Sequence, residues 1–287
     1  MYIKPRILII GNSTAGKSTV GGIIADHLDT RHTSTSQMIV DEFATARRMS
    51  TQDVWHLKAS RAGRNELFNF ANRRKHETED PAHFALKALE HGHVVDGVRT
   101  RTEFAAARAH FDLCLWKCGG EPNATDCVPR ECADYEIPNF DGDWRVDMAD
   151  WVPGHVHDWL ATPNGYVAGL YSTDSTPELR RARAQESAEW ACRLRELGLR
   201  AFDPIGTFLP LDDWWADPAE CYWRIIELCK VQCARFRHRD YVLLRPDWRE
   251  SRGAGLELEF LRQNTERIAY AEAGIENVRH YLTEMAG

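Results

Sequence analysis

The sequence predicts an α/β protein made of two domains, each built around a parallel sheet. Short apolar runs alternate with longer segments of helical periodicity, and the same alternation starts again in the second half of the chain. The chain has 287 residues, of which 43% are hydrophobic, and this length suits about two domains of ordinary size. We place the boundary near Pro163-Asn164, after a stretch rich in proline and glycine. The expected domains are residues 1–163 and 164–287.

Composition and charge exclude several classes of protein. A net charge of −7 provides no overall positive field that would recruit nucleic acid. No apolar run is long enough to span a membrane, and no secretory segment follows the first residues, so we expect a cytoplasmic protein. The eight cysteines are expected to be free thiols there. Four of them lie close together but lack the paired spacing of common zinc sites; these are Cys114, Cys118, Cys127 and Cys132.

The elements of the first domain follow from periodicity and from capping residues. Ile7–Ile10 is an apolar run typical of a buried strand, and Asp80-Pro81 pairs a helix cap with a proline at the first helical position. Residues 119–164 are expected to hold little regular structure apart from a turn at Asp141-Gly142-Asp143 and a short helix around Asp147. The predicted strands are 6–13, 93–99 and 111–116, and the predicted helices are 17–28, 36–48, 51–71, 81–91 and 103–110.

The second domain shows the same alternation. Gly198 closes a long helical pattern, and Pro218 opens another. The predicted strands are 166–171, 199–205, 241–244 and 267–270, and the predicted helices are 177–197, 218–236 and 253–263. This order predicts a second, smaller parallel sheet flanked by helices.

A phosphate-binding motif follows the first strand directly. Gly11 and Gly16 allow the backbone amides to face an anion, Lys17 can reach the β and γ phosphates, and Ser18 is placed to bind Mg²⁺. The helix that begins near Lys17 adds its positive N-terminal end. The sequence therefore predicts binding of ATP with Mg²⁺ by a P-loop that consists of Gly11, Asn12, Ser13, Thr14, Ala15, Gly16, Lys17, Ser18 and Thr19.

A second polar group lies at the end of the strand over residues 93–99. Asp96 and Arg99 belong to an Asp-Gly-Val-Arg turn, and open parallel sheets present their ligands at the carboxyl ends of strands. Asp96 could complete the Mg²⁺ shell or accept a proton, and Arg99 could hold the phosphate of an acceptor. An ion pair at the strand end is the alternative interpretation.

These residues together resemble the bacteriophage-type deoxynucleoside monophosphate kinases. The resemblance spans about residues 5–160 and implies a P-loop kinase fold with a three-layer parallel sheet. It also implies phosphorylation of a deoxynucleoside monophosphate by ATP, with Lys58, Arg61 and Arg99 around the acceptor phosphate. Arg130 is the candidate for the closing lid, which is otherwise not recognisable. The residues that carry the resemblance are Gly11–Lys17, Ser36, Phe43-Ala44, Lys58, Arg61, Asp96–Arg99, Trp116 and Asn139-Phe140-Asp141-Gly142.

Three segments after the boundary, in this order, resemble the nucleoside 2-deoxyribosyltransferase superfamily, which includes deoxynucleoside monophosphate N-glycosidases. They are Tyr166–Ser172, Phe202–Ile205 and Asp240–Glu257. The resemblance covers residues 164 to about 275 and implies a Rossmann-like, flavodoxin-like domain.

A carboxylate one turn into a helix that follows a Ser/Gly loop can be aimed at the anomeric carbon of a sugar. Glu257 would then be the nucleophile, oriented by Tyr166, with Ser251 and Gly253 holding a phosphate or hydroxyl. Trp214 or Trp248 could stack on the base or cover the pocket. A solvated helix carboxylate is the other interpretation of Glu257.

One feature of that superfamily is missing. An aspartate that often supports the catalytic glutamate is expected shortly before the third strand, but residues 231–239 contain none. Asp203, Asp213 or Asp217 are the candidates to replace it.

The leading hypothesis is a bifunctional enzyme of nucleotide metabolism, of phage origin by resemblance and therefore located in the host cytoplasm. One domain would phosphorylate a deoxynucleoside monophosphate, and the other would break or exchange an N-glycosidic bond. The alternatives are a kinase of a hydroxymethylated base in DNA, and a kinase whose second domain only senses nucleotides. Small nucleotides are the expected partners, with no membrane or nucleic acid. The base, the choice between hydrolysis and transfer, and the oligomeric state are left open.

Overall fold

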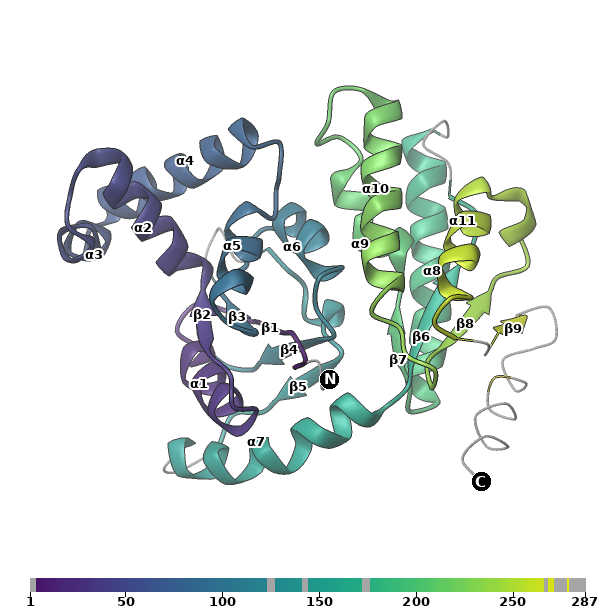
Figure 1. Ribbon diagram of the computed structural model, residues 1–287, viewed down its shortest axis with the longest axis horizontal. Coiled ribbons are helices and arrows are strands. Elements are labelled where there is room, and N and C mark those ends of the chain that lie inside the picture. The colour runs from purple at the N-terminus through teal and green to yellow at the C-terminus, as the bar shows by residue number, and fades with distance from the viewer. Residues whose placement is uncertain are drawn as a thin grey trace. The chain divides into compact units, whose positions relative to one another are not determined.

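The computed structural model of the chain describes residues 4–122, 127–140, 144–171, 176–265, 268–270 and 278. The chain divides into two compact units, Met1–Trp159 and Leu160–Gly287, whereas the sequence suggested a boundary a few residues later. Each unit is built around its own parallel sheet (Figure 1). The expected α/β class is therefore confirmed.

The first unit contains a five-stranded sheet with the strand order β2-β3-β1-β4-β5. Every neighbouring pair is parallel, and Ile9 in the central strand is aligned with Asp96 on one side and Leu115 on the other. The central strand is fully buried, which explains its continuous apolar sequence. The strands are β1 (Ile7–Ile10), β2 (His32–Ser34), β3 (Val94–Asp96), β4 (Leu113–Lys117) and β5 (Tyr135–Ile137).

Helices cover both faces of this sheet. Figure 1 shows α1 and α7 on one face and α5 and α6 on the other, while α2, α3 and α4 form a group that extends away from the sheet. The helices are α1 (Lys17–His27), α2 (Thr35–Arg47), α3 (Thr51–Ala59), α4 (Arg61–Glu77), α5 (His83–His91), α6 (Arg101–Arg108) and α7 (Trp144–Ala161), with a 3₁₀ turn, η1, at Arg130–Cys132.

The prediction of one continuous helix over residues 51–71 is wrong, because Ser60 separates two helices, α3 and α4. Ser60 has an extended backbone, and its hydroxyl accepts a hydrogen bond from the Gly63 amide at 3.0 Å, which caps α4. A Cβ on Gly63 would lie 2.0 Å from the carbonyl oxygen of Leu57. The tight approach of α3 to α4 therefore requires glycine at this position.

The sparse structure expected over residues 119–164 is also wrong, because α7 is 18 residues long. Its buried side chains recur at helical spacing, namely Met148, Val152, Val156 and Trp159. This stripe outweighs the helix-breaking tendency of Pro153, which lies inside the helix. The turn expected at Asp141-Gly142-Asp143 lies outside the described residues.

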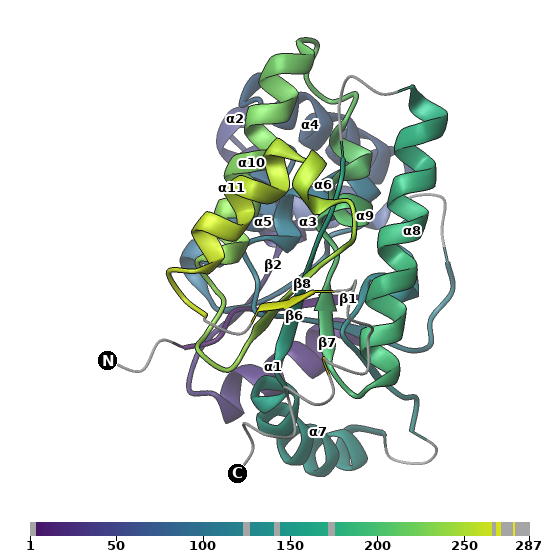
Figure 2. The same cartoon turned by 90° about the vertical axis from the view of Figure 1, so that its right-hand side faces the viewer.

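The second unit contains a four-stranded parallel sheet in the order β7-β6-β8-β9. Figure 2 shows α8 on one face and α10 and α11 on the other. Val167, Leu194 and Leu243 belong to the core beneath α8. The elements are β6 (Asn164–Ala168), α8 (Pro177–Glu196), β7 (Arg200–Phe202), α9 (Pro204–Phe208), η2 (Leu209–Leu211), α10 (Pro218–Cys233), β8 (Tyr241–Leu244), η3 (Trp248–Glu250), α11 (Arg252–Leu261) and β9 (Ile268–Tyr270).

Two further features bear on function. All eight cysteines lie in the described part of the chain, and none of them forms a disulfide. Among the described residues, no helix combines the length and apolar character needed to cross a membrane.

Candidate functional sites

The P-loop forms the turn between β1 and α1. Gly11 and Gly16 have φ angles of +138° and +86°, in the region that glycine adopts without strain. A Cβ on Gly11 would lie 2.5 Å from the carbonyl oxygen of Lys117, so β4 presses directly against the loop. The Lys17 ammonium donates hydrogen bonds to the carbonyl oxygens of Gly11 and Asn12.

Asp96 and Ser18 meet beside this loop. The Ser18 hydroxyl donates to Asp96 Oδ2 at 2.7 Å, and the Asp96 side chain is buried at the end of β3. Two oxygens so placed at the start of α1 match the ligands that Mg²⁺ prefers. The sequence analysis missed His32, whose Nε2 lies 3.2 Å from the same Asp96 oxygen. Its strand, β2, is too short and polar to be recognised from periodicity.

Arg99 also contacts the P-loop. Its guanidinium donates to the Ser13 hydroxyl at 3.3 Å, and its backbone amide donates to Glu103 at 3.4 Å. Glu103 in turn forms a buried ion pair with Lys75 at 3.2 Å. The Arg99 turn is thus fixed from α4 through two side chains that the sequence analysis did not assign. The pattern Thr100-x-x-Glu103, a capping box at the start of α6, was the available signal.

A cavity of about 530 Å³ opens between α2, α4 and the Arg99 turn. Five cations line it, namely Lys58, Arg61, Arg64, Lys75 and Arg99. The structure therefore brings Lys58 and Arg61 to the same cavity as Arg99. The remaining lining residues are Thr35, Ser36, Ile39, Val40, Asn65, Leu67, Phe68, Ala71, Asn72, Gly97, Thr100 and Glu103.

The charge of this cavity is unusual. The pKa of Lys58 is lowered to about 8. Burial is the main cause, the nearby positive charge of Arg99 acts in the same direction, and Asp96 acts against both. Lys58 also lies over the ring of Trp55, 4.3 Å from its centroid. Cations that lie close together in a partly buried space destabilise one another's charged form. Such a cavity favours the binding of an anion.

Arg130 is not part of this cavity. It is exposed in η1 and forms an ion pair with Glu136, so the structure does not place it as a lid residue. Of the segment Asn139–Gly142, the Asn139 side chain accepts a hydrogen bond from Lys117 at 2.9 Å, and Phe140 packs on Trp151. Asp141 and Gly142 lie outside the described residues.

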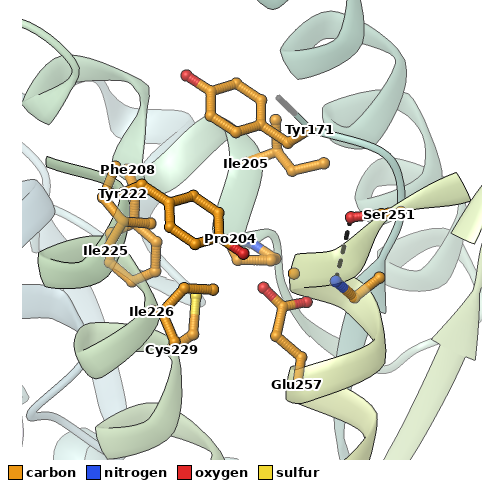
Figure 3. Close-up of a pocket in the computed structure, with 13 residues that line it drawn as sticks. Tyr171, Pro204, Ile205, Phe208, Tyr222, Ile225, Ile226, Cys229, Ser251 and Glu257 are labelled. Carbon is orange, nitrogen blue, oxygen red and sulfur yellow. Dashed lines mark hydrogen bonds between the residues drawn. The ribbon is translucent and has the colours of Figure 1, made fainter. Parts of the chain in front are cut away.

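The second candidate site surrounds Glu257 at the start of α11 (Figure 3). Ser251 caps this helix by accepting a hydrogen bond from the Ala254 amide at 3.1 Å, and Glu257 lies one turn further on, 8% exposed. Its carboxyl points into a cavity of about 40 Å³. The cavity is lined by Gly169, Tyr171, Pro204, Ile205, Phe208, Tyr222, Ile225, Ile226, Cys229, Ser251, Gly253, Ala254 and Glu257.

Glu257 is therefore not a solvated helix carboxylate. Burial raises its pKa to about 7, while the Cys229 thiol and the Tyr166 hydroxyl favour the ionised form and offset part of the rise. Tyr166 is fully buried in β6, and its ring packs against Phe202 and Phe236. A carboxyl that is half ionised near neutral pH can act as a nucleophile or exchange a proton.

Ser251 and Gly253 line this cavity as expected, but Asp203, Trp214 and Trp248 do not. Asp203 is buried, but its carboxylate caps α9 through the Gly206 amide at 3.0 Å and accepts from the Ser187 hydroxyl at 2.6 Å. Trp214 and Trp248 are half-buried and do not line the cavity. Ser172 lies outside the described residues. Instead, the structure adds Tyr222 and Cys229 from α10, which the sequence analysis had not assigned.

Within the described residues, no group of three or more His, Cys, Asp or Glu side chains is arranged to hold a metal ion. The chain matches no family model, no curated protein and no solved structure in the three comparisons made. The functional interpretation therefore depends on the geometry of the two sites.

Proposed function

We propose that the chain is a bifunctional enzyme of nucleotide metabolism. Its first unit would be a P-loop kinase that transfers phosphate from ATP to a deoxynucleoside monophosphate. Its second unit, of the flavodoxin-like type, would break or exchange the N-glycosidic bond of a deoxynucleotide.

The kinase proposal depends mainly on one arrangement. The P-loop, the Ser18–Asp96 pair and a cavity lined by cations adjoin one another at the carboxyl end of the first sheet. Phosphoryl transfer requires positioning and charge neutralisation more than covalent help from the protein, and this set of groups provides both.

In this reaction an oxygen of the acceptor phosphate attacks the γ phosphorus, the bond to the bridging oxygen breaks, and ADP leaves. Bound ATP with Mg²⁺ would supply the phosphoryl group and neutralise its charge. The P-loop amides and Lys17 would hold its β and γ phosphates, with Ser18 and Asp96 on the side of the metal. Lys58, Arg61 and Arg99 would hold the acceptor phosphate.

The proposal for the second unit depends on Glu257. Its buried carboxyl, with a pKa of about 7, faces a cavity beside the capped start of α11. In the ionised form it could attack the anomeric carbon of the sugar, and the nucleobase would leave with the electrons of the N-glycosidic bond and take up a proton. Water or a second base would then release the sugar from the carboxylate.

The test is to incubate the full chain with ATP, Mg²⁺ and each deoxynucleoside monophosphate, and to measure diphosphate and free base by mass spectrometry. Lys17→Ala should abolish diphosphate formation. Glu257→Gln should abolish base release, whereas Glu259→Gln, an exposed residue of the same helix, should not change it.

Other outcomes would reject parts of the proposal. Phosphate transfer to hydroxymethylated duplex DNA but to no monophosphate would overturn the assigned acceptor. Diphosphate formation without any base release would leave the second unit as a nucleotide-sensing module.

A further inference from the structure

One wall of the 530 Å³ cavity is not explained by phosphate binding. The cations account for one part of its lining, but α4 also contributes an aromatic ring between two amides, namely Asn65, Phe68 and Asn72. Two aliphatic residues of α2, Ile39 and Val40, also line the cavity. This wall is chemically different from the cationic part.

The three α4 side chains share one face of the helix. Asn65 and Phe68 are three residues apart, and Phe68 and Asn72 are four apart, which are the spacings of neighbours on a helix surface. Asn69, the residue after Phe68, is exposed and does not line the cavity. The aromatic ring and its two flanking amides therefore point to the same space.

Phe68 is unusually exposed for a phenylalanine beside other apolar groups. It is 41% exposed, although Leu67 and Phe70 of the same helix are buried. A ring kept accessible inside a concave site is suited to cover a flat apolar ligand. Aromatic side chains stack on bases in complexes with single-stranded nucleic acid, and every base has a face that can stack.

The amides supply what a stacked ring lacks, because an Asn side chain can donate and accept hydrogen bonds at the edge of a base. Glu103 is the only acid among the described residues that line the cavity, and it is paired with Lys75. Asn65 and Asn72 are the groups beside Phe68 on α4 that can bind the edge of a base.

We infer that this wall is a nucleobase subsite, in which Phe68 stacks on the base of the phosphate acceptor and Asn65 and Asn72 bind its edge. The inference depends on the proposed kinase function, and it specifies that the acceptor is a nucleotide and not a sugar phosphate without a base. The cavity volume lies within the roughly 300–1,000 Å³ of small-molecule sites.

The experiment measures kinase kinetics of the full chain with four deoxynucleoside monophosphates and with 2-deoxyribose 5-phosphate. Phe68→Ala should raise KM for the nucleotides about tenfold or more and leave kcat nearly unchanged, because stacking far from the reacting phosphate stabilises ground state and transition state alike. Phe68→Tyr should restore most of the affinity.

The amides should affect selectivity. Asn65→Ala and Asn72→Ala should change the ratios of kcat/KM among the four bases at least threefold, while Asn69→Ala, the matched control on the same helix, should leave the ratios unchanged. Circular dichroism of each variant verifies that α4 still folds, and Phe68→Leu provides a second variant if Phe68→Ala is unstable.

Failure of this inference is distinguishable from failure of the kinase proposal. If the unaltered chain phosphorylates nucleotides and Phe68→Ala keeps the same KM, or if 2-deoxyribose 5-phosphate is an equally good acceptor, the base subsite is wrong and the kinase stands. If no phosphate is transferred, calorimetric titration with the monophosphates decides. Binding that is lost in Phe68→Ala supports the subsite without kinase activity, and absence of binding overturns both.

Discussion

At the scale of single residues, Glu257 shows how a buried site opposes stability. Its carboxyl is 8% exposed, and burial raises its pKa from the usual 4.5 to about 7. The folded chain therefore keeps a proton that the unfolded chain releases above about pH 4.5. The contribution of Glu257 to the free energy of unfolding therefore falls as the pH rises from about 4.5 to 7. Above pH 7 its destabilising effect is complete.

We predict that Glu257→Gln stabilises the second unit at high pH. The amide has a similar size and no charge to bury, so the variant should be more stable by about 1–3 kcal/mol at pH 8 and nearly equal to the parent at pH 5. Urea unfolding at both pH values measures this difference. A gain of the same size at pH 5 would show that ionisation of Glu257 is not its cause, and Glu259→Gln is the exposed control.

At the scale of elements, Glu42 connects three helices of the first unit. From α2 its carboxylate contacts Arg74 of α4 at 3.2 Å and His83 of α5 at 2.8 Å, and it also accepts from Lys87. Burial acts to raise the pKa of Glu42, but hydrogen bonds from Lys87, His83 and Arg74 outweigh it and lower the pKa to about 2. Glu42 therefore links α2 and α4, which both line the 530 Å³ cavity, to α5.

We predict that Glu42→Gln destabilises the first unit by about 1–2 kcal/mol at pH 7, a value reduced for the solvent exposure of the partners. Because the pKa is lowered, the contribution of Glu42 is complete above about pH 4.5 and is lost as the pH falls towards 2. Urea unfolding at pH 7 and pH 3 should show the deficit shrinking. Glu66→Gln removes an exposed ion pair with Arg47 and should cost less than about 0.5 kcal/mol.

Sequence patterns predicted the elements that bury continuous apolar runs or carry clear caps. The strand at Tyr241–Leu244 was predicted with its observed ends, and the P-loop was recognised from its setting. The strand at His32–Ser34 was not predicted, because three half-buried residues, two of them small and polar, show no detectable alternation of apolar and polar side chains. The helix over Trp144–Ala161 was underestimated because Pro153 and Gly154 suggested a break, whereas packing of its buried stripe decides the outcome.

The candidate sites show the same limit. Ser18 and Asp96 were proposed because each belongs to a local motif, the P-loop and the Asp-Gly-Val-Arg turn at a strand end, although they lie 78 residues apart in the chain. Lys75 and Tyr222 could not be found, since long-range packing alone brings their helices to the sites. Asp203 was a candidate to support Glu257, although its local role as the cap of α9 was already suggested by the Pro204 that follows it.

At the scale of the whole molecule, two compact units with separate sheets predict separable activities. Lys17→Ala should reduce phosphate transfer by at least a thousandfold and leave base release from a monophosphate within about twofold of the parent. Glu257→Gln should do the reverse. Parallel assays of both products for both variants provide the measurement, and a variant that loses both activities while remaining folded would contradict this separation.

The small size of the cavity at Glu257 has a consequence for the affinity of any nucleotide that binds there. A volume of about 40 Å³ has room for one or two water molecules, whereas a nucleotide needs several times that space. A nucleotide can therefore bind only when the walls formed by α9 and α10 lie further apart, either before binding or as a result of it. Its apparent affinity is then the intrinsic affinity multiplied by the fraction of molecules that are open, and substitutions that only widen this entrance should tighten binding without touching the ligand.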